Sequence, residues 1–212
     1  MSNDDLSKTL IIPNPGGRRK PSNTAVSPSI PSTPEPVAPQ APQVPINPNQ
    51  FNLNVATCLG ENIILSYASN ILMLANNLRS LEPNNSIEQL RLDIEKLVVK
   101  FDQEMQDAGL KKEVVLTARY LICCLVDELV LSTPWGSDSV WSHQTLLGKF
   151  HNETSGGEKF FLIVNKLLEQ PERNIDLIEL CYVCISTGFC GKYRVINQGE
   201  GELLQISQKL YQ

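Results

Sequence analysis

Residues 112–131 read KEVVLTARYLICCLVDELVL and indicate the architecture of this 212-residue chain. Apolar side chains occupy nearly every position of the stretch, so a helix with 3.6 residues per turn would be apolar nearly all round. A helix without a polar face is buried. We therefore expect residues 112–131 to form the central helix of the fold.

The residues before this stretch predict two amphipathic helices. Apolar residues recur at three- and four-residue steps over 59–78 and again over 90–105, which is the helical period. The sequence of residues 86–89, Ser-Ile-Glu-Gln, has the form of a capping box, and Gly109 is a suitable C-cap. Both helices would pack their apolar faces against the central one.

The residues after it predict further helices. We expect a short helix at 139–149, capped by Ser137 or Asp138, and others at 158–169, 174–187 and 200–212. Polar or glycine-containing loops at 151–157 and 188–195 separate them. Because no stretch alternates with period two over the length of a strand, the predicted fold class is all-α, a compact domain of six to seven helices.

The first fifty residues differ in composition from the rest. They hold eleven of the 14 prolines and none of the 13 aromatic residues, so we expect a disordered Pro-rich tail over 1–50 and a folded domain over 51–212. Residues 51–212 carry 14 basic and 20 acidic side chains. A nucleic-acid partner is not expected, because binding phosphates requires clustered Lys and Arg.

Membrane and export signals are not predicted within these residues. The longest wholly apolar run is Tyr120–Val126, whereas a membrane-spanning helix needs about 20 apolar residues. The N-terminus has neither the basic start nor the apolar stretch of a signal peptide. We therefore expect the cysteines to be thiols in a reducing compartment.

Two adjacent carboxylates, Asp127 and Glu128, follow the most apolar part of the central stretch. One interpretation is that one of the two carboxylates accepts hydrogen bonds from the backbone of the turn at 132–136. Another is a solvent-facing acidic patch that binds a basic partner. Catalysis by a pair of carboxylates is a third reading, but no nucleophile, metal-ligand set or phosphate loop accompanies the pair.

The other candidate groups favour packing over chemistry. Cys181-x-x-Cys184 has redox or zinc spacing, but both cysteines lie within a predicted helix, so we expect no metal and no cofactor. His143 and His151 are expected to be structural or exposed. Trp135, like Trp141, is either a core anchor or an interface residue.

The tail contains one distinctive segment, residues 8–20, with the sequence KTLIIPNPGGRRK. A short apolar strip is followed there by a turn-forming Pro-Gly-Gly and a basic triplet. The segment is either a solvated tail or a short linear motif that binds a partner. In the second case Thr9 is a candidate phosphorylation site.

Several long motifs together resemble one family. Residues 118–136, ARYLICCLVDELVLSTPWG, are similar to a signature of the TssL/DotU (IcmH-like) secretion proteins. The resemblance continues through 142–147, 150–161, 176–182 and 188–194, and the tail at 9–19 is similar to the N-termini of type VI members. It covers nearly all of residues 51–212.

The resemblance implies a bacterial inner-membrane component of the type VI secretion system, with this domain facing the cytoplasm. It implies two small packed helical bundles, a C-terminal transmembrane helix after 203–211, and no enzymatic activity or small-molecule substrate. No such membrane helix occurs within the 212 residues, so we expect the native chain to continue. The implied partners are the IcmF-like protein TssM and the baseplate subunit TssK, with a homodimer as a further option through that membrane helix.

Together these observations predict a scaffold that binds its partners through Asp127, Glu128, Trp135, His151 and Glu153. Reversal of both carboxylates to lysine would then weaken binding and leave the domain folded. Two alternatives remain: a DotU/IcmH component of a type IVB secretion system, and a soluble hydrolase that uses Asp127, Glu128 or His151.

Overall fold

A computed structural model describes residues 62–81 and 87–212 of the chain. In these ranges every regular element is helical, with eight α-helices, two 3₁₀ turns and no strand, which confirms the all-α prediction. The α-helices are α1 (Ile63–Leu78), α2 (Ile87–Asp107), α3 (Lys112–Leu131), α4 (Pro134–Ser137), α5 (Leu146–His151), α6 (Lys159–Leu167), α7 (Pro171–Thr187) and α8 (Gly199–Tyr211). The 3₁₀ turns are η3 (Val140–Ser142) and η4 (Gly191–Arg194).

Several predictions lie outside the described residues. They are the Pro-rich tail at 1–50, the phosphorylation site at Thr9, the domain boundary at residue 51 and the capping residue Ser86. These stay predictions.

The central helix α3 has the bounds expected from the sequence, Lys112–Leu131. Twelve of its residues are buried, and it packs against α1, α2, α5 and α7. Buried side chains from all the longer helices belong to one hydrophobic cluster. The apolar character of α3 on all sides is therefore explained by neighbours on all sides.

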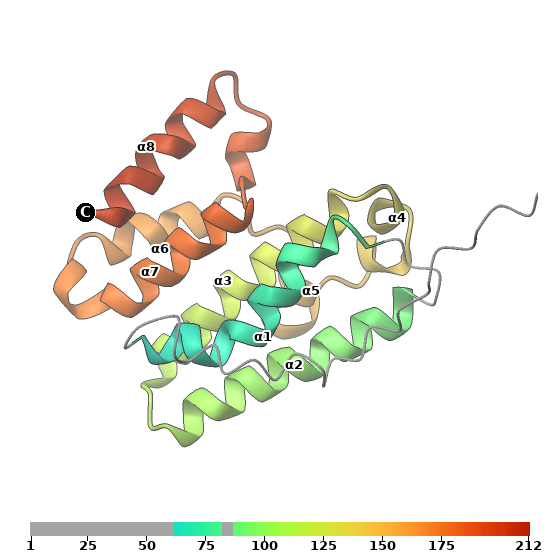
Figure 1. The fold of residues 1–212 in the computed structure, drawn as a ribbon, viewed down its shortest axis with the longest axis horizontal. Helices are drawn as coiled ribbons and strands as arrows, with labels where there is room; N and C mark the ends of the chain where they lie inside the picture. The colour runs from blue at the N-terminus through green and yellow to red at the C-terminus, as the bar shows by residue number, and fades with distance from the viewer. Residues whose placement is uncertain (1–61, 82–86) are drawn as a thin grey trace, which may run out of the picture. The chain divides into compact units, whose positions relative to one another are not determined.

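The helices form two groups that share this cluster (Figure 1). In the first, α1 and α2 pack on α3, and α5 packs on α3 as well. In the second, α6 and α8 pack on α7. The groups are joined because α7 also packs against α1 and α3. These two groups correspond to the expected pair of bundles.

Glycines end two of the long helices with the same hydrogen-bond pattern. Gly109 and Gly188 have φ values of 77° and 113°, a left-handed conformation that suits glycine. After α2, the N–H of Leu110 donates to the carbonyl of Met105, and after α7 the N–H of Phe189 donates to that of Cys184. Both ends are Schellman motifs.

The segment at 139–149 differs from its prediction as one helix. It consists of η3 and α5, separated by residues 143–145. The predicted caps Ser137 and Asp138 are wrong, because Ser139 caps η3 and Thr145 caps α5 through their hydroxyl groups. The four-residue α4 accounts for the eighth helix.

The burial of α3 yields a test of stability. Leu125 is fully buried, whereas Leu162 on α6 is 59% exposed. We expect Leu125→Ala to lower the free energy of unfolding by about 2–5 kcal/mol, since it removes apolar contacts and leaves a cavity. The matched variant Leu162→Ala should change it by about 0.5 kcal/mol or less. Urea unfolding followed by circular dichroism measures both, and equal effects would contradict the central placement of α3.

Candidate functional site

A cleft of about 300 Å³ lies beside the C-terminal half of α3. One wall includes Leu147 of α5 and the loop at 154–157, and another includes Phe189 and Arg194, which follow α7. The floor of the cleft is α3. Gly156 allows the loop to approach this helix closely, since a Cβ at residue 156 would lie 2.3 Å from Sγ of Cys124. Hydroxyl groups of Thr145, Thr154 and Ser155 add polar lining.

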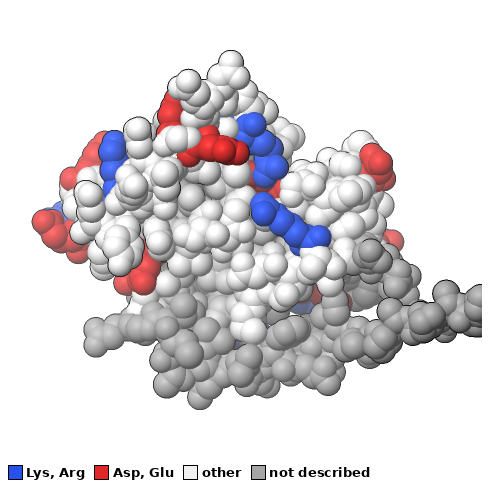
Figure 2. Space-filling view, turned by 45° about the horizontal axis from the view of Figure 1, so that its top comes forward, with Lys and Arg blue, Asp and Glu red and all other residues white. Residues whose placement is uncertain are grey.

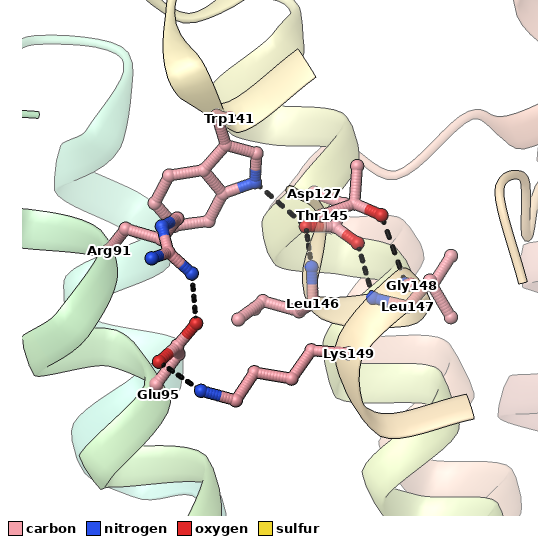
Figure 3. A network of polar contacts seen from close by, with 9 residues as sticks. All are labelled: Arg91, Glu95, Asp127, Trp141, Thr145, Leu146, Leu147, Gly148 and Lys149. Carbon is pink, nitrogen blue, oxygen red and sulfur yellow. Dashed lines mark hydrogen bonds and ion pairs between the residues drawn. The ribbon is translucent and has the colours of Figure 1, made fainter. Parts of the chain in front are cut away.

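Asp127 lies under this cleft and is 4% exposed. Its Oδ1 accepts hydrogen bonds from the indole N–H of Trp141 at 2.8 Å and from the backbone N–H of Leu146 at 2.9 Å. Its Oδ2 accepts one from the N–H of Leu147 at 2.8 Å. Figure 3 shows the carboxylate between the indole and the first turn of α5.

The bonds of Asp127 correct two predictions from the sequence. The side chain is buried, so it offers no charge to a partner at the surface. Its donors are in η3 and α5 and not in the turn at 132–136. A carboxylate at the N-terminus of α5 satisfies N–H groups that have no partner within the helix. Burial nevertheless raises the pKa of Asp127 from 3.8 to about 6, against the lowering effect of these bonds.

A second polar group ties α5 to α2. Arg91 forms an ion pair with Glu95 within α2, and Lys149 of α5 lies 2.6 Å from the other oxygen of Glu95. The Glu95 side chain is 7% exposed. Figure 3 shows this group beside Trp141. Together with Asp127, it links α5 to both α2 and α3.

Glu128 holds the opposite side of the cleft. Its Oε1 accepts hydrogen bonds from the N–H of Cys190 at 2.9 Å and from the guanidinium of Arg194 at 2.7 Å. Its Oε2 accepts one from the N–H of Gly191 at 2.8 Å. The side chain is 17% exposed and that of Arg194 is 43% exposed. Both carboxylates predicted as a partner surface are thus engaged within the chain.

The turn at 132–136 forms local hydrogen bonds through Thr133 and uses neither carboxylate as an acceptor. The hydroxyl of Thr133 accepts a hydrogen bond from the N–H of Gly136 at 3.0 Å and donates one to the carbonyl of Val130 at 2.7 Å. Trp135 is half-buried on α4 and does not line the cleft. Trp141 is fully buried, in agreement with a core anchor.

His151 and Glu153 belong to a separate polar cluster with Arg119, Tyr120 and Lys159. The guanidinium of Arg119 donates to Nε2 of His151 at 3.4 Å, and the ring of Tyr120 meets the imidazole edge-on at 5.0 Å. Glu153 accepts a hydrogen bond from the hydroxyl of Tyr120 at 2.9 Å and pairs with Lys159. The structure brings His151 and Glu153 together, but not with Trp135.

The titratable groups do not favour a hydrolase. Burial and the Arg119 guanidinium lower the pKa of His151 from 6.5 to about 4, so it is a weak base at neutral pH. Burial raises the pKa of the Cys123 and Cys124 thiols, the opposite of what a nucleophile needs. Cys181 and Cys184 are buried thiols as well. Within residues 62–81 and 87–212, no group of three or more His, Cys, Asp or Glu side chains is arranged to hold a metal ion.

Sequence reasoning missed several residues of the site. It assigned no role to Tyr120, Gly191 or Arg194, although all three lie in the motifs that resemble the family. The glycines of 188–195 indicated a loop, but they did not indicate that its backbone donates hydrogen bonds to Glu128 of α3. The partner-binding roles of Glu128, Trp135, His151 and Glu153 stay predictions.

The bonds of Asp127 predict a cost for removing its charge. In Asp127→Asn the new NH2 group would replace one carboxylate oxygen and would face an N–H donor of Trp141, Leu146 or Leu147. At least one of these buried donors would then lose its acceptor. We expect the free energy of unfolding to fall by about 1–3 kcal/mol. The control Asp138→Asn changes an exposed aspartate at the end of α4. Urea unfolding of both variants measures the difference, and a wild-type value for Asp127→Asn would refute the capping role.

The low pKa of His151 predicts a dependence of stability on pH. Between about pH 4 and 6.5 the unfolded state binds more protons at this residue than the folded state, so acidification through that window destabilises the fold. Asp127 contributes the opposite slope, because its folded pKa is raised. We therefore expect His151→Gln to lose less stability than the wild type between about pH 7 and about pH 4.5. Urea unfolding at both pH values measures this.

The exposed residue His143 supplies the control. His143→Gln should retain the pH dependence of the wild type. If His151→Gln and the wild type lose stability equally on acidification, the environment assigned to His151 is wrong.

Comparisons with known proteins agree on one family. The sequence model of the family described as "Type VI secretion system protein DotU" matches residues 63–212. No curated protein matches the chain. The crystal structure of TssL from Vibrio cholerae is 31% identical, with a TM-score of 0.65, over 71% of this chain and 94% of that one.

Two further structures share the fold at lower identity. The cytoplasmic domain of TssL from Acinetobacter baumannii is 18% identical, with a TM-score of 0.64, over 70% of this chain and 96% of that one. SciP/TssL from enteroaggregative Escherichia coli is 22% identical, with a TM-score of 0.59, over 69% of this chain and 84% of that one. None of the helices in the described residues is long and apolar enough to cross a membrane. The chain belongs to the DotU family of type VI secretion system proteins.

Proposed function

We propose that this chain is a non-enzymatic scaffold of the type VI secretion membrane complex at the bacterial inner membrane. In this role the helical domain faces the cytoplasm, binds the IcmF-like protein TssM and recruits the baseplate through TssK. Membership of the DotU family supports the assignment to the secretion system. The proposed docking site is the cleft beside α3.

The observation that carries this proposal is the construction of the cleft. Its floor and walls are fixed by internal hydrogen bonds of Asp127 and Glu128, while its polar lining at Thr154 and Ser155 is exposed. A preformed cleft of this kind lowers the ordering cost of binding. The carboxylates would then act by holding the walls, and the partner would contact the rim.

The surface charge supports local recognition over attraction by a broad acidic field. Figure 2 shows a face on which Lys and Arg side chains lie among Asp and Glu side chains, with a wide uncharged area between them. At the cleft, Glu128 is balanced by Arg194. Charges placed in this way orient a partner more than they add affinity.

The alternative functions have less support. A soluble hydrolase would require an activated nucleophile. The pKa of the Cys124 thiol at the cleft is raised, and the Asp127 carboxylate already accepts three hydrogen bonds from within the chain. A type IVB role remains the second candidate within the family. The description of the matching family and the similarity to TssL from Vibrio cholerae favour type VI.

A blocking substitution tests the docking site. Ser155 is exposed and lines the cleft, so a tryptophan there would fill space needed by a partner. We expect Ser155→Trp to weaken binding to TssK or TssM by about tenfold or more, equivalent to about 1.4 kcal/mol. Isothermal calorimetry with each purified partner measures the affinity.

The matched control is Ser186→Trp, which places the same side chain at an exposed position of α7 outside the cleft lining. It should bind like the wild type. Undiminished binding by Ser155→Trp, or an equal loss in both variants, would argue against the cleft as the docking site.

A further inference from the structure

The contact between Glu128 and residues 190–194 has a second consequence, for the C-terminal helix. We propose that this contact, the Glu128 clasp, couples occupancy of the cleft to the position of α8. The clasp comprises the three hydrogen bonds from Cys190, Gly191 and Arg194 to the Glu128 carboxylate. The coupling rests on the proposed function, because it requires a partner in the cleft.

The clasp is the polar link between α3 and the segment that leads into α8. Glu128 makes all the hydrogen bonds between the side chains of α3 and residues 189–195. The same segment is held on its other side by the N–H of Lys192, which donates to the carbonyl of Gly157 at 3.1 Å. Without the clasp, η4 would lose its hydrogen bonds to α3 and would keep this bond and the edge-on contact of Tyr193 with Phe161, whose ring centroids lie 4.6 Å apart.

The placement of α8 depends on this segment. The main contacts of α8 are with α7 and η4, and only Gly199 and Leu210 of its residues are buried. Gly199 packs tightly on η4, since a Cβ there would lie 2.1 Å from the carbonyl oxygen of Tyr193. Helices with few buried residues have low local stability. A change in η4 is thus transmitted directly to the start of α8.

The clasp is also accessible from the cleft. Glu128, Gly191 and Arg194 all line it, and the guanidinium is the more exposed partner of the ion pair. A docked segment that carries an acidic side chain would compete with Glu128 for Arg194. Transfer of Arg194 to that carboxylate would weaken the clasp and release η4 and α8. Binding energy in the cleft would then shift the position of the C-terminal helix.

Amide hydrogen exchange of the chain measures the clasp without any partner. We expect Glu128→Gln to speed exchange in residues 190–211 by about tenfold or more, while the rates in α1 and α2 stay unchanged. Arg194→Gln keeps the two backbone bonds to Glu128 and should give a smaller increase in the same residues. The control Lys209→Gln removes an exposed cation of α8 that has no ion pair in the described part of the chain.

Two results would contradict the role of the clasp in holding η4 and α8. One is unchanged exchange of α8 in both clasp variants. The other is an equal increase throughout the helices, which would show general loss of stability. If Glu128→Gln does not fold, Arg194→Gln decides between these outcomes.

Exchange in the presence of purified TssK then tests the coupling. We expect bound TssK to protect the cleft loop at 154–157 and to speed exchange in α8, with a smaller increase in Arg194→Gln, where the ion pair is already absent. Binding of TssK with unchanged α8 rates would overturn the coupling and leave the proposed function intact. Failure of the wild type to bind TssK or TssM would overturn the proposed function, and the coupling with it.

Discussion

Two adjacent carboxylates on the central helix hold the two walls of the cleft. Asp127 accepts three hydrogen bonds from η3 and α5, and Glu128 accepts three from residues 190–194. Successive residues on a helix point about 100° apart, so neighbouring side chains reach different neighbours. The pair therefore connects α3 to both sides of the cleft from one point in the sequence.

This arrangement explains why acidic residues occur in an otherwise apolar helix. Backbone N–H groups at the starts of α5 and η4 have no partners within those short elements. The carboxylates supply acceptors, and α3 can remain surrounded by apolar contacts on its other sides. The same residues that would look like an acidic surface in the sequence thus serve as internal acceptors for two short helical turns.

The sequence predicted the helical fold well, because the signals involved are local. The bounds of α3, the glycine ends at Gly109 and Gly188 and the amphipathic pattern of the outer helices follow from residues close together in the chain. The partners of Asp127 and Glu128 could not be predicted in this way. Their donors lie 14–20 and 62–66 residues away, so the pairing depends on tertiary packing.

The failure at 139–149 has a similar cause. The segment is rich in weak helix formers such as Ser, Val, Thr and Gly, Trp141 is buried and donates to Asp127, and Thr145 caps a new helix. Tertiary contacts decide between one helix and two where the local preference is weak.

The free energy of unfolding of the double variant Asp127→Lys/Glu128→Lys is the most direct test that both carboxylates are internal acceptors. Internal acceptors for buried N–H groups cannot be replaced by cations, and a buried unpaired charge costs about 3–5 kcal/mol. We therefore expect a large loss of stability or failure to fold. A variant that keeps wild-type stability and loses only partner binding would contradict this expectation, and would return both carboxylates to the surface role inferred from the sequence.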